Sequence, residues 1–151
     1  MVVKVVNKSK FGLPKYQTSG AAGFDICANI DKPMTLSSKD WELIPSGLYF
    51  QVPEGYELQV RPRSGLAFKN GVTVLNTPGT VDSDYTGEVK VILINLSPYD
   101  FTVNPGDRIA QGVISPIAQA EFVEVDELDK TERGDGGFGH SGVSNVPEEE
   151  V

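Results

Sequence analysis

Cysteine and histidine are almost absent from this sequence, which has one of each, Cys27 and His140. A single cysteine cannot form an internal disulfide or build a cysteine-rich zinc site. A single histidine argues equally against a histidine-based metal site. No hydrophobic run reaches transmembrane length, and the first ten residues are too poor in apolar side chains for a secretory signal. We therefore expect a soluble, cytoplasmic protein with no membrane contact.

Positive charge is also scarce. The 151 residues carry 13 Lys and Arg against 21 Asp and Glu, for a formal net charge of −8. This balance opposes stable binding of nucleic acid or of an anionic membrane surface. A polyanionic ligand would need a locally basic site or a metal cation. The length predicts one domain, large enough to bury a substantial core.

Helical periodicity is missing as well, because no stretch before residue 126 sustains an apolar stripe for three helical turns. Short strand patterns separated by Gly and Pro turns predict an all-β sandwich, jelly roll or closed barrel. We expect at most one short helix, which begins near Ser64 with that residue as a cap. The expected strands are Val2–Val6, Ala21–Ala28, Met34–Leu36, Trp41–Ile44, Gly47–Val52 after a Pro45–Ser46 turn, Tyr56–Arg61, Val72–Leu75, Val89–Ile94, Arg108–Ile114 and Ala120–Val125.

A change of composition near Asp126 predicts a folded domain over residues 1–126 and a flexible, glycine-rich tail over 127–151. The tail contains an aromatic residue, Phe138, within a run of glycines. A plain linker has no need of an aromatic ring, which gains stability only by packing on a base or in a pocket. The segment from Arg133 to Gly142 is therefore interpreted as a lid that orders over a nucleotide, with Arg133 and Ser141 reaching a phosphate.

The segment from Asn76 to Asn95 combines turn residues, two acids and an aromatic with a long β-branched run. It predicts a hairpin whose loop, with Asp82 and Tyr85, forms a binding pocket mounted on a sheet. A surface turn explains the same residues.

Two further segments suit an anionic ligand. Arg61 to Gly65 places two guanidinium groups, a hydroxyl and a glycine at a strand-to-helix transition, which suits phosphate or a solvated turn. Asp107 to Gln111 opens a strand with an acid, a base and an amide, which suits a site or a cross-strand ion pair.

Two single residues near the start of the chain also carry predictions. Gly23 predicts a bulge or a close backbone approach. Cys27 is expected to be a small core residue.

Taken in order, these segments resemble the five motifs of the trimeric deoxyuridine triphosphate nucleotidohydrolase (dUTPase) family. The resemblance covers residues 21 to 142, and five weak or moderate motifs in the right order are together highly specific. The matching segments are Ala22–Asp25, Pro62–Ala67, Gly79–Gly87, Gly106–Gln111 and Arg133–Gly142.

The resemblance implies a dUTPase-type β jelly roll and a homotrimer whose active sites are each built from several chains. The implied enzyme is a dUTP diphosphatase, a hydrolase of nucleotide metabolism that uses magnesium to convert dUTP and water to dUMP and pyrophosphate. Such an enzyme keeps uracil out of DNA and supplies dUMP for thymidylate synthesis.

Roles for individual residues follow from the same resemblance. Asp82 is the implied general base, which agrees with the ability of a carboxylate to accept a proton from water, and Gln111 holds the water or the α-phosphate. Asp25 contacts Mg²⁺ through water. The implied substrate-binding residues are Arg63, Ser64 and Gly65 for the phosphates; Asn76, Gly79 and Lys90 for the uracil edge; Tyr85 for the deoxyribose; and Arg133, Phe138, Gly139, His140 and Ser141 for closure of the tail, with Phe138 stacked over uracil.

Two alternatives remain at this point. A dCTP deaminase shares the fold but uses a glutamate on the strand after the hairpin, where this sequence aligns Ile92. A nucleotide-binding interaction protein without turnover is the second alternative, and the presence of Asp82 and a complete lid argues against it.

Overall fold

The computed structural model of this chain describes residues 1–144. The chain divides into two compact units, Met1–Ala118 and Gln119–Val151. Within the described part of the chain, no helix is long and apolar enough to cross a membrane.

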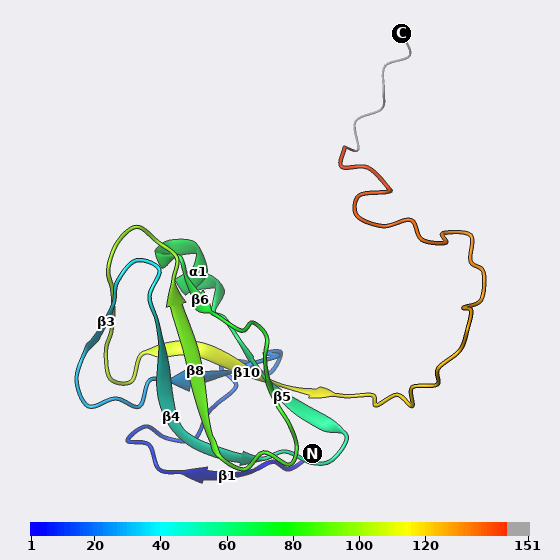
Figure 1. The fold of residues 1–151 in the computed structure, drawn as a ribbon. Coiled ribbons are helices and arrows are strands. Elements are labelled where there is room, and N and C mark those ends of the chain that lie inside the picture. Colours follow the sequence, from blue (N-terminus) through cyan, green and yellow to red (C-terminus); the bar gives the residue numbers. More distant parts are fainter. Residues whose placement is uncertain (145–151) are drawn as a thin grey trace. The chain divides into compact units, whose positions relative to one another are not determined.

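The first unit holds all of the regular secondary structure in residues 1–144: ten strands and one helix of seven residues (Figure 1). The elements are β1 (Lys4–Asn7), β2 (Phe24–Cys27), β3 (Met34–Leu36), β4 (Trp41–Gln51), β5 (Tyr56–Arg61), α1 (Ser64–Asn70), β6 (Val72–Val74), β7 (Gly79–Val81), β8 (Glu88–Asn95), β9 (Phe101–Val103) and β10 (Arg108–Pro116).

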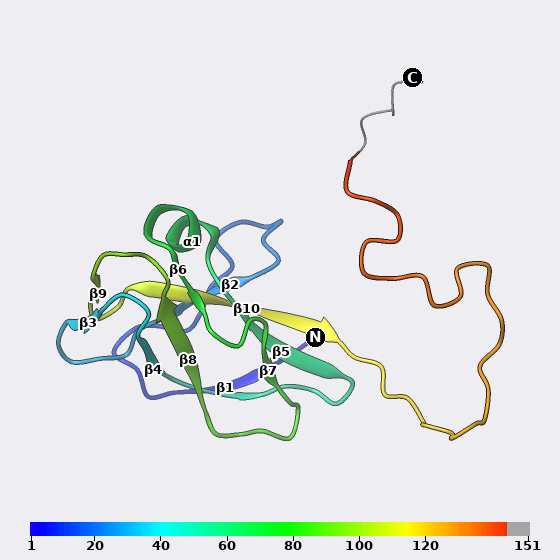
Figure 2. The ribbon, with the colours of Figure 1, turned by 45° about the horizontal axis from the view of Figure 1, so that its top comes forward.

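The strands form two four-stranded antiparallel sheets and a small pair. The first sheet has the order β1-β4-β8-β6, the second has β2-β10-β5-β7, and β3 pairs with β9. Figure 2 shows β10 running between β2 and β5. This central position of β10 brings the two segments on either side of it to the same sheet, although they are far apart in the sequence.

The core lies between the two sheets because buried and exposed residues alternate along the strands, as expected for sheets packed face to face. Phe24 of β2 stacks on Phe50 of β4 with ring centroids 5.8 Å apart, which joins the second sheet to the first. Gly112 of β10 lies under Phe24, where a Cβ atom would come within 2.5 Å of the ring. Leu58 and Val91 contribute from β5 and β8 and are completely buried.

Several predicted elements are confirmed. Met34–Leu36 and Tyr56–Arg61 form strands with the predicted bounds, and the single short helix occurs where the period-two pattern ends. The helix stops at Gly71, whose φ of 63° lies in the left-handed region that glycine tolerates. The all-β fold class with at most one short helix is therefore confirmed.

Four local predictions are wrong. Trp41 to Gln51 is one strand, because the Pro45–Ser46 segment is a bulge with a register shift against β8 instead of a turn. The helix cap is Arg63, without a side-chain cap hydrogen bond, and Ser64 is the first helical residue. No strand forms at residues 120–125 of the described chain. Cys27 is only half-buried, because it alternates with the core residues Phe24 and Ile26 of β2.

The predicted hairpin is also wrong in its pairing. β7 pairs with β5, and β8 pairs with β4 and β6, so the two strands belong to different sheets. The local turn pattern is present, but the core partners of each strand determine the pairing. As a result, the loop from Asp82 to Gly87 connects the two sheets.

Candidate active site

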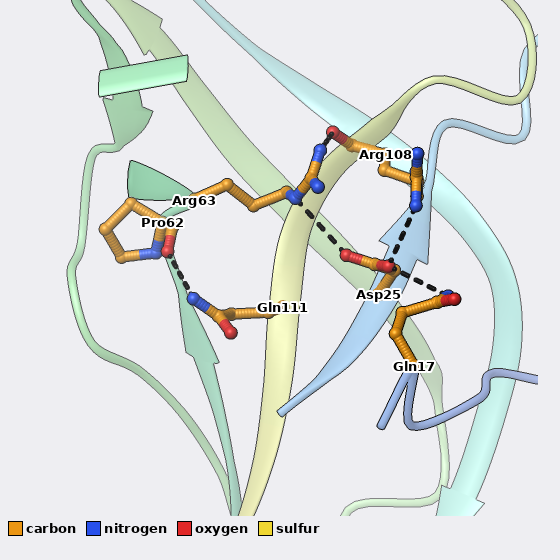
Figure 3. Close-up of polar contacts among 6 residues, drawn as sticks. All are labelled: Gln17, Asp25, Pro62, Arg63, Arg108 and Gln111. Carbon is orange, nitrogen blue, oxygen red and sulfur yellow. Dashed lines mark hydrogen bonds and ion pairs between the residues drawn. The ribbon is translucent and has the colours of Figure 1, made fainter. Parts of the chain in front are cut away.

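A carboxylate held by two arginines forms the first part of the candidate site (Figure 3). Asp25 of β2 lies 3.2 Å from the Arg63 Nε atom and 3.5 Å from the Arg108 Nη1 atom. Gln17 donates a further hydrogen bond of 3.2 Å to the same carboxylate. The Asp25 side chain is 15% exposed, whereas Arg63 and Arg108 are 33% and 53% exposed. The arginines therefore keep donors free for an anionic ligand while Asp25 fixes their positions.

Strand register explains why these residues meet. Gln111 of β10 lies opposite Asp25 on one side and opposite Arg61 on the other. Arg63 follows β5 by two residues and donates a 3.0 Å hydrogen bond to the Arg108 carbonyl oxygen. The interpretation of the Asp107–Gln111 segment as part of a cross-strand ion pair is thus confirmed for Arg108.

The Gln111 side chain is fixed from two sides. Its Nε2 atom donates a 2.9 Å hydrogen bond to the Pro62 carbonyl oxygen. Its Oε1 atom lies against Gly23, where a Cβ atom would come within 2.6 Å of it. The close backbone approach predicted at Gly23 is therefore confirmed.

The charge environment of this cluster also acts on Cys27, which lies two residues after Asp25 and pairs in register with Arg108. Partial burial raises the pKa of the Cys27 thiol, and the neighbouring Asp25 carboxylate raises it further. Arg108 and Arg63 lower the same pKa but do not reverse the shift. The neutral thiol is therefore favoured over the thiolate.

A pocket of about 400 Å³ forms the second part of the candidate site. It opens between β7 and β8, where the two strands separate to join different sheets. Its lining consists of Leu43, Thr80, Val81, Asp82, Tyr85, Glu88, Val89, Lys90 and Ile92. The position aligned with the deaminase glutamate, Ile92, is thus an apolar part of this lining.

Main-chain polar groups border this pocket. Among the described residues, β7 is an edge strand with β5 as its partner, and β8 pairs with β6 only from Leu93 to Asn95. The backbone edges of β7 and of the first half of β8 therefore face the pocket without strand partners. Such edges offer alternating donors and acceptors at fixed spacing.

Tyr85 closes the loop at the mouth of the pocket. Its backbone N–H donates to the Asp82 carbonyl oxygen at 3.1 Å, and its hydroxyl donates to the Glu88 carbonyl oxygen at 2.9 Å. The ring lies over Gly87, where a Cβ atom would meet the tyrosine oxygen at 2.6 Å. Asp82 is exposed, and the Lys90 Nζ atom lies 3.8 Å from the Glu88 carboxylate.

The other predicted site residues of the first unit lie at the start of α1 and next to β7. Ser64 and Gly65 are exposed in the first turn of α1, beside Arg63. Asn76 directs its Nδ2 atom toward Gly79, 3.4 Å from where a Cβ atom of that glycine would lie. Gly79 itself is buried at the start of β7.

The second unit carries the predicted lid residues in a series of local turns. The Arg133 Nε atom donates to the Gly136 carbonyl oxygen at 2.7 Å, and the His140 N–H donates to the Gly137 carbonyl oxygen at 3.1 Å. Phe138 is fully exposed and has a φ of 52°. Gly139 and Ser141 belong to the same turns, and the Gly142 N–H closes the last one on Gly139.

The fold keeps two groups of predicted site residues apart, one around Asp25 and one around Asp82, and Gly79 lies between them opposite Val60. β7 runs antiparallel to β5 with Val81 opposite Leu58, so Asp82 lies level with Glu57. Arg63 lies six residues further along the extended chain, which is about 20 Å at the rise of a strand. One chain therefore holds the arginine cluster and the pocket at opposite ends of β5.

Arg108, Gln17 and Glu88 belong to these two groups but were not predicted as site residues. Arg108 was available from the sequence, since it lies within the Asp107–Gln111 segment. The roles of Gln17 and Glu88 depend on contacts with Asp25 and with Tyr85 that leave no pattern in the sequence.

This combination defines a class: a two-sheet β protein with partly exposed arginines around a carboxylate and a pocket bordered by backbone edges. The chain belongs to the dUTPase family, whose model matches residues 9–142. A deoxyuridine 5'-triphosphate nucleotidohydrolase of Fusobacterium nucleatum is 59% identical over 140 residues, covering 93% of this chain and 96% of the relative. A protein of the same name from Finegoldia magna is 50% identical over 142 residues, covering 94% and 99%.

A solved structure agrees with this assignment. The G164S mutant of the Staphylococcus bacteriophage 80alpha dUTPase, solved with dUpNHpp, superposes with a TM-score of 0.85. It is 26% identical to this chain, and the match covers 94% of this chain and 99% of the phage protein. The dUTPase fold predicted from the five motifs is therefore confirmed.

Proposed function

We propose that this protein is a homotrimeric jelly-roll enzyme that hydrolyses dUTP to dUMP and pyrophosphate. The reaction keeps uracil out of DNA and supplies dUMP for thymidylate synthesis, and it takes place inside the cell, where its nucleotide substrate is found. The observation that carries the proposal is the pocket between β7 and β8, which has backbone edges without strand partners as well as Asp82 and Tyr85 in its lining.

Uracil enters this pocket in the proposed complex. The separated backbone edges supply donors and acceptors at fixed positions, so they match uracil and mismatch cytosine, while a narrow pocket excludes the methyl group of thymine. Asn76, Gly79 and Lys90 belong to this base-recognising segment. The Tyr85 ring packs against the deoxyribose and leaves no room for a 2′-hydroxyl group.

Asp82 is the proposed general base. It accepts a proton from water while the water oxygen bonds to the α-phosphorus. The bond from the α-phosphorus to the bridging oxygen breaks, and pyrophosphate leaves with that oxygen. Exposure of the Asp82 side chain supports this role, because attacking water can reach the carboxylate.

The arginine cluster is the proposed phosphate site. Arg63, Ser64 and Gly65 bind phosphate oxygens, and Gln111 holds either the attacking water or the α-phosphate. Support comes from the free donors on Arg63 and from the fixed orientation of the Gln111 amide. Local positive charge of this kind offsets the triphosphate on a protein whose net charge is −8.

Mg²⁺ is the proposed cofactor. The described residues contain no group of three or more Asp, Glu, His or Cys side chains that could hold a metal ion. Asp25 is a single carboxylate beside two guanidinium groups. This donor set fits an ion that arrives with the substrate phosphates and touches Asp25 through water. When bound, the ion would neutralise phosphate charge.

The separation of about 20 Å along β5 supports sites that are shared between chains. In the proposed complex Asp82 acts at the α-phosphorus, and the phosphate-binding arginines of the same site come from another chain. The tail supplies the third part, with Phe138 over uracil and Arg133, Gly139, His140 and Ser141 around the γ-phosphate. Exposed Trp41 and Leu43 on the outer face of β4 support contact between chains.

Pyrophosphate release across dUTP, dTTP, dCTP and UTP, with and without Mg²⁺, tests the proposed activity. We expect dUTP to be hydrolysed far faster than the other three nucleotides. Equal rates on all four would contradict the proposed base and sugar selection, and ammonia release from dCTP would indicate deamination.

A mixed oligomer tests the shared site. Asp82→Asn and Arg63→Ala should each be nearly inactive alone, because each removes one part of every site. Refolding the two variants together at equal amounts would pair intact Asp82 from one chain with intact Arg63 from another in about a quarter of the sites. Mixed oligomers with no recovered activity would show that one chain supplies both residues to the same site.

A further inference from the structure

The Tyr85 loop is connected to a rigid bulge in β4, and the connection runs through Glu88. The bulge lies at Pro45–Leu48, where the register of β4 shifts against β8. It is held by neighbouring backbone: Lys8 donates to the Gly47 carbonyl oxygen at 2.8 Å, and Asn29 donates to the Pro45 carbonyl oxygen at 2.8 Å.

The bulge is further fixed by Ser46, which is only 3% exposed. Its hydroxyl donates to the Val89 carbonyl oxygen and accepts from the Leu48 N–H at 3.1 Å. Gly47 has a φ of 70°, and a Cβ atom there would meet Ser9 at 2.7 Å. Only glycine fits this position, so the bulge has little freedom to move.

Glu88 joins this bulge to the substrate pocket. Its carboxylate Oε1 atom accepts a 2.9 Å hydrogen bond from the buried Gly47 N–H. Its backbone carbonyl oxygen accepts the 2.9 Å hydrogen bond from the Tyr85 hydroxyl. The side chain is 20% exposed and its other oxygen lies 3.8 Å from the Lys90 Nζ atom. Glu88 therefore connects the tyrosine ring to the bulge in β4.

We infer that Glu88 is a positioning residue for sugar selection: its carboxylate holds the Tyr85 ring where the ring excludes a 2′-hydroxyl group. This inference rests on the proposed function, because it assigns the ring to the deoxyribose. Glu88 takes no part in the chemical step, since its side chain bonds to the β4 backbone. Loss of the carboxylate leaves the Gly47 N–H without its acceptor and releases the loop that carries Tyr85.

The test compares kcat/KM for dUTP and for UTP in four proteins: wild type, Glu88→Ala, Glu88→Gln and Glu42→Ala. Glu88→Ala should lower the dUTP to UTP ratio by roughly five- to tenfold, as expected for the loss of one positioning hydrogen bond. Glu88→Gln keeps an acceptor for the Gly47 N–H and should stay within about twofold of wild type. Glu42→Ala removes an exposed glutamate of β4 and should leave the ratio unchanged.

A folded Glu88→Ala protein with the wild-type ratio would overturn the inference, even with a lowered melting temperature, because a merely structural role would change stability alone. If Glu88→Ala does not fold, Tyr85→Phe breaks the same connection at its other end and should lower the ratio similarly; an unchanged ratio would again overturn the inference. A wild type that hydrolyses no dUTP would contradict the proposed function instead. In that case the ratio of dUMP to UMP affinity, measured by calorimetry, decides the role of Glu88 in the same variants.

Discussion

Gly23 offers a way to displace the Gln111 amide without changing any functional group. A Cβ atom at residue 23 would lie 2.6 Å from Gln111 Oε1 and 3.3 Å from the Gly112 carbonyl oxygen. The amide oxygen must therefore retreat by about 0.8 Å to reach ordinary van der Waals contact. That movement strains the 2.9 Å hydrogen bond from Gln111 Nε2 to the Pro62 carbonyl oxygen.

We expect Gly23→Ala to lower kcat for dUTP roughly 10- to 100-fold, because a displacement near 1 Å is costly for a group that aligns reactants. The unfolding free energy should change by less than about 1 kcal/mol, since the atom that yields is the end of a flexible side chain. The assay is steady-state pyrophosphate release, with thermal unfolding as the measure of stability. Gly20→Ala is the matched control, because a Cβ atom there meets nothing within 4 Å.

Combining Gly23→Ala with Gln111→Ala separates the proposed cause from a general effect on β2. If Gly23→Ala acts only by moving Gln111, the double variant should be no slower than Gln111→Ala alone. Two losses that multiply would show that residue 23 acts on catalysis by another route. A Gly23→Ala protein with wild-type kcat would refute the reasoning that the position of the Gln111 amide matters.

Three further predictions follow from single residues. Asp82→Asn should keep the fold and the binding of dUTP while lowering kcat by roughly 10²–10⁴, and near-normal turnover would place the general base elsewhere. Gly87→Ala should push the Tyr85 ring away and narrow the preference for dUTP over UTP; an unchanged ratio would contradict the ring's proposed role. The raised pKa of Cys27 favours the neutral thiol in the folded state, so iodoacetamide should alkylate the native protein slowly until the pH exceeds 9.0. The stability that this shift contributes is present below the unfolded pKa and is lost as the pH rises through the folded pKa. Equal alkylation rates in native and urea-unfolded protein at pH 8 would contradict the shift.

Local patterns were enough to predict elements whose signal lies within a few residues. The alternation from Tyr56 to Arg61 gave the correct bounds of β5, because one face of that strand is buried and the other is not. The strand Phe101–Val103 was not predicted. The bulge in β4 resembled a turn, because Pro45 and Gly47 are also typical turn residues.

Contacts between distant strands could not be predicted in this way. Asp25 and Arg108 meet because β10 pairs with β2 in one register, and no local pattern in either strand fixes that register. The same limit explains the wrong pairing of β7, which lies beside β5 instead of β8. Family resemblance named the candidate site residues without these contacts, but it gave neither the separation of Asp82 from Arg63 nor the connection from Tyr85 to the β4 bulge.

Glycine shows most clearly what a sequence leaves open. The chain has 16 glycines, and the sequence predicts a close approach at Gly23 without showing which side chain lies there. Around Gly12 and Gly20 a Cβ atom would meet nothing within 4 Å, whereas at Gly23 and Gly87 it would strike Gln111 and Tyr85. These two glycines carry no functional group, yet each makes room for a side chain of the proposed site. They belong to the site because of the space they leave, and the identity of the side chain that fills this space is known only from the folded neighbours.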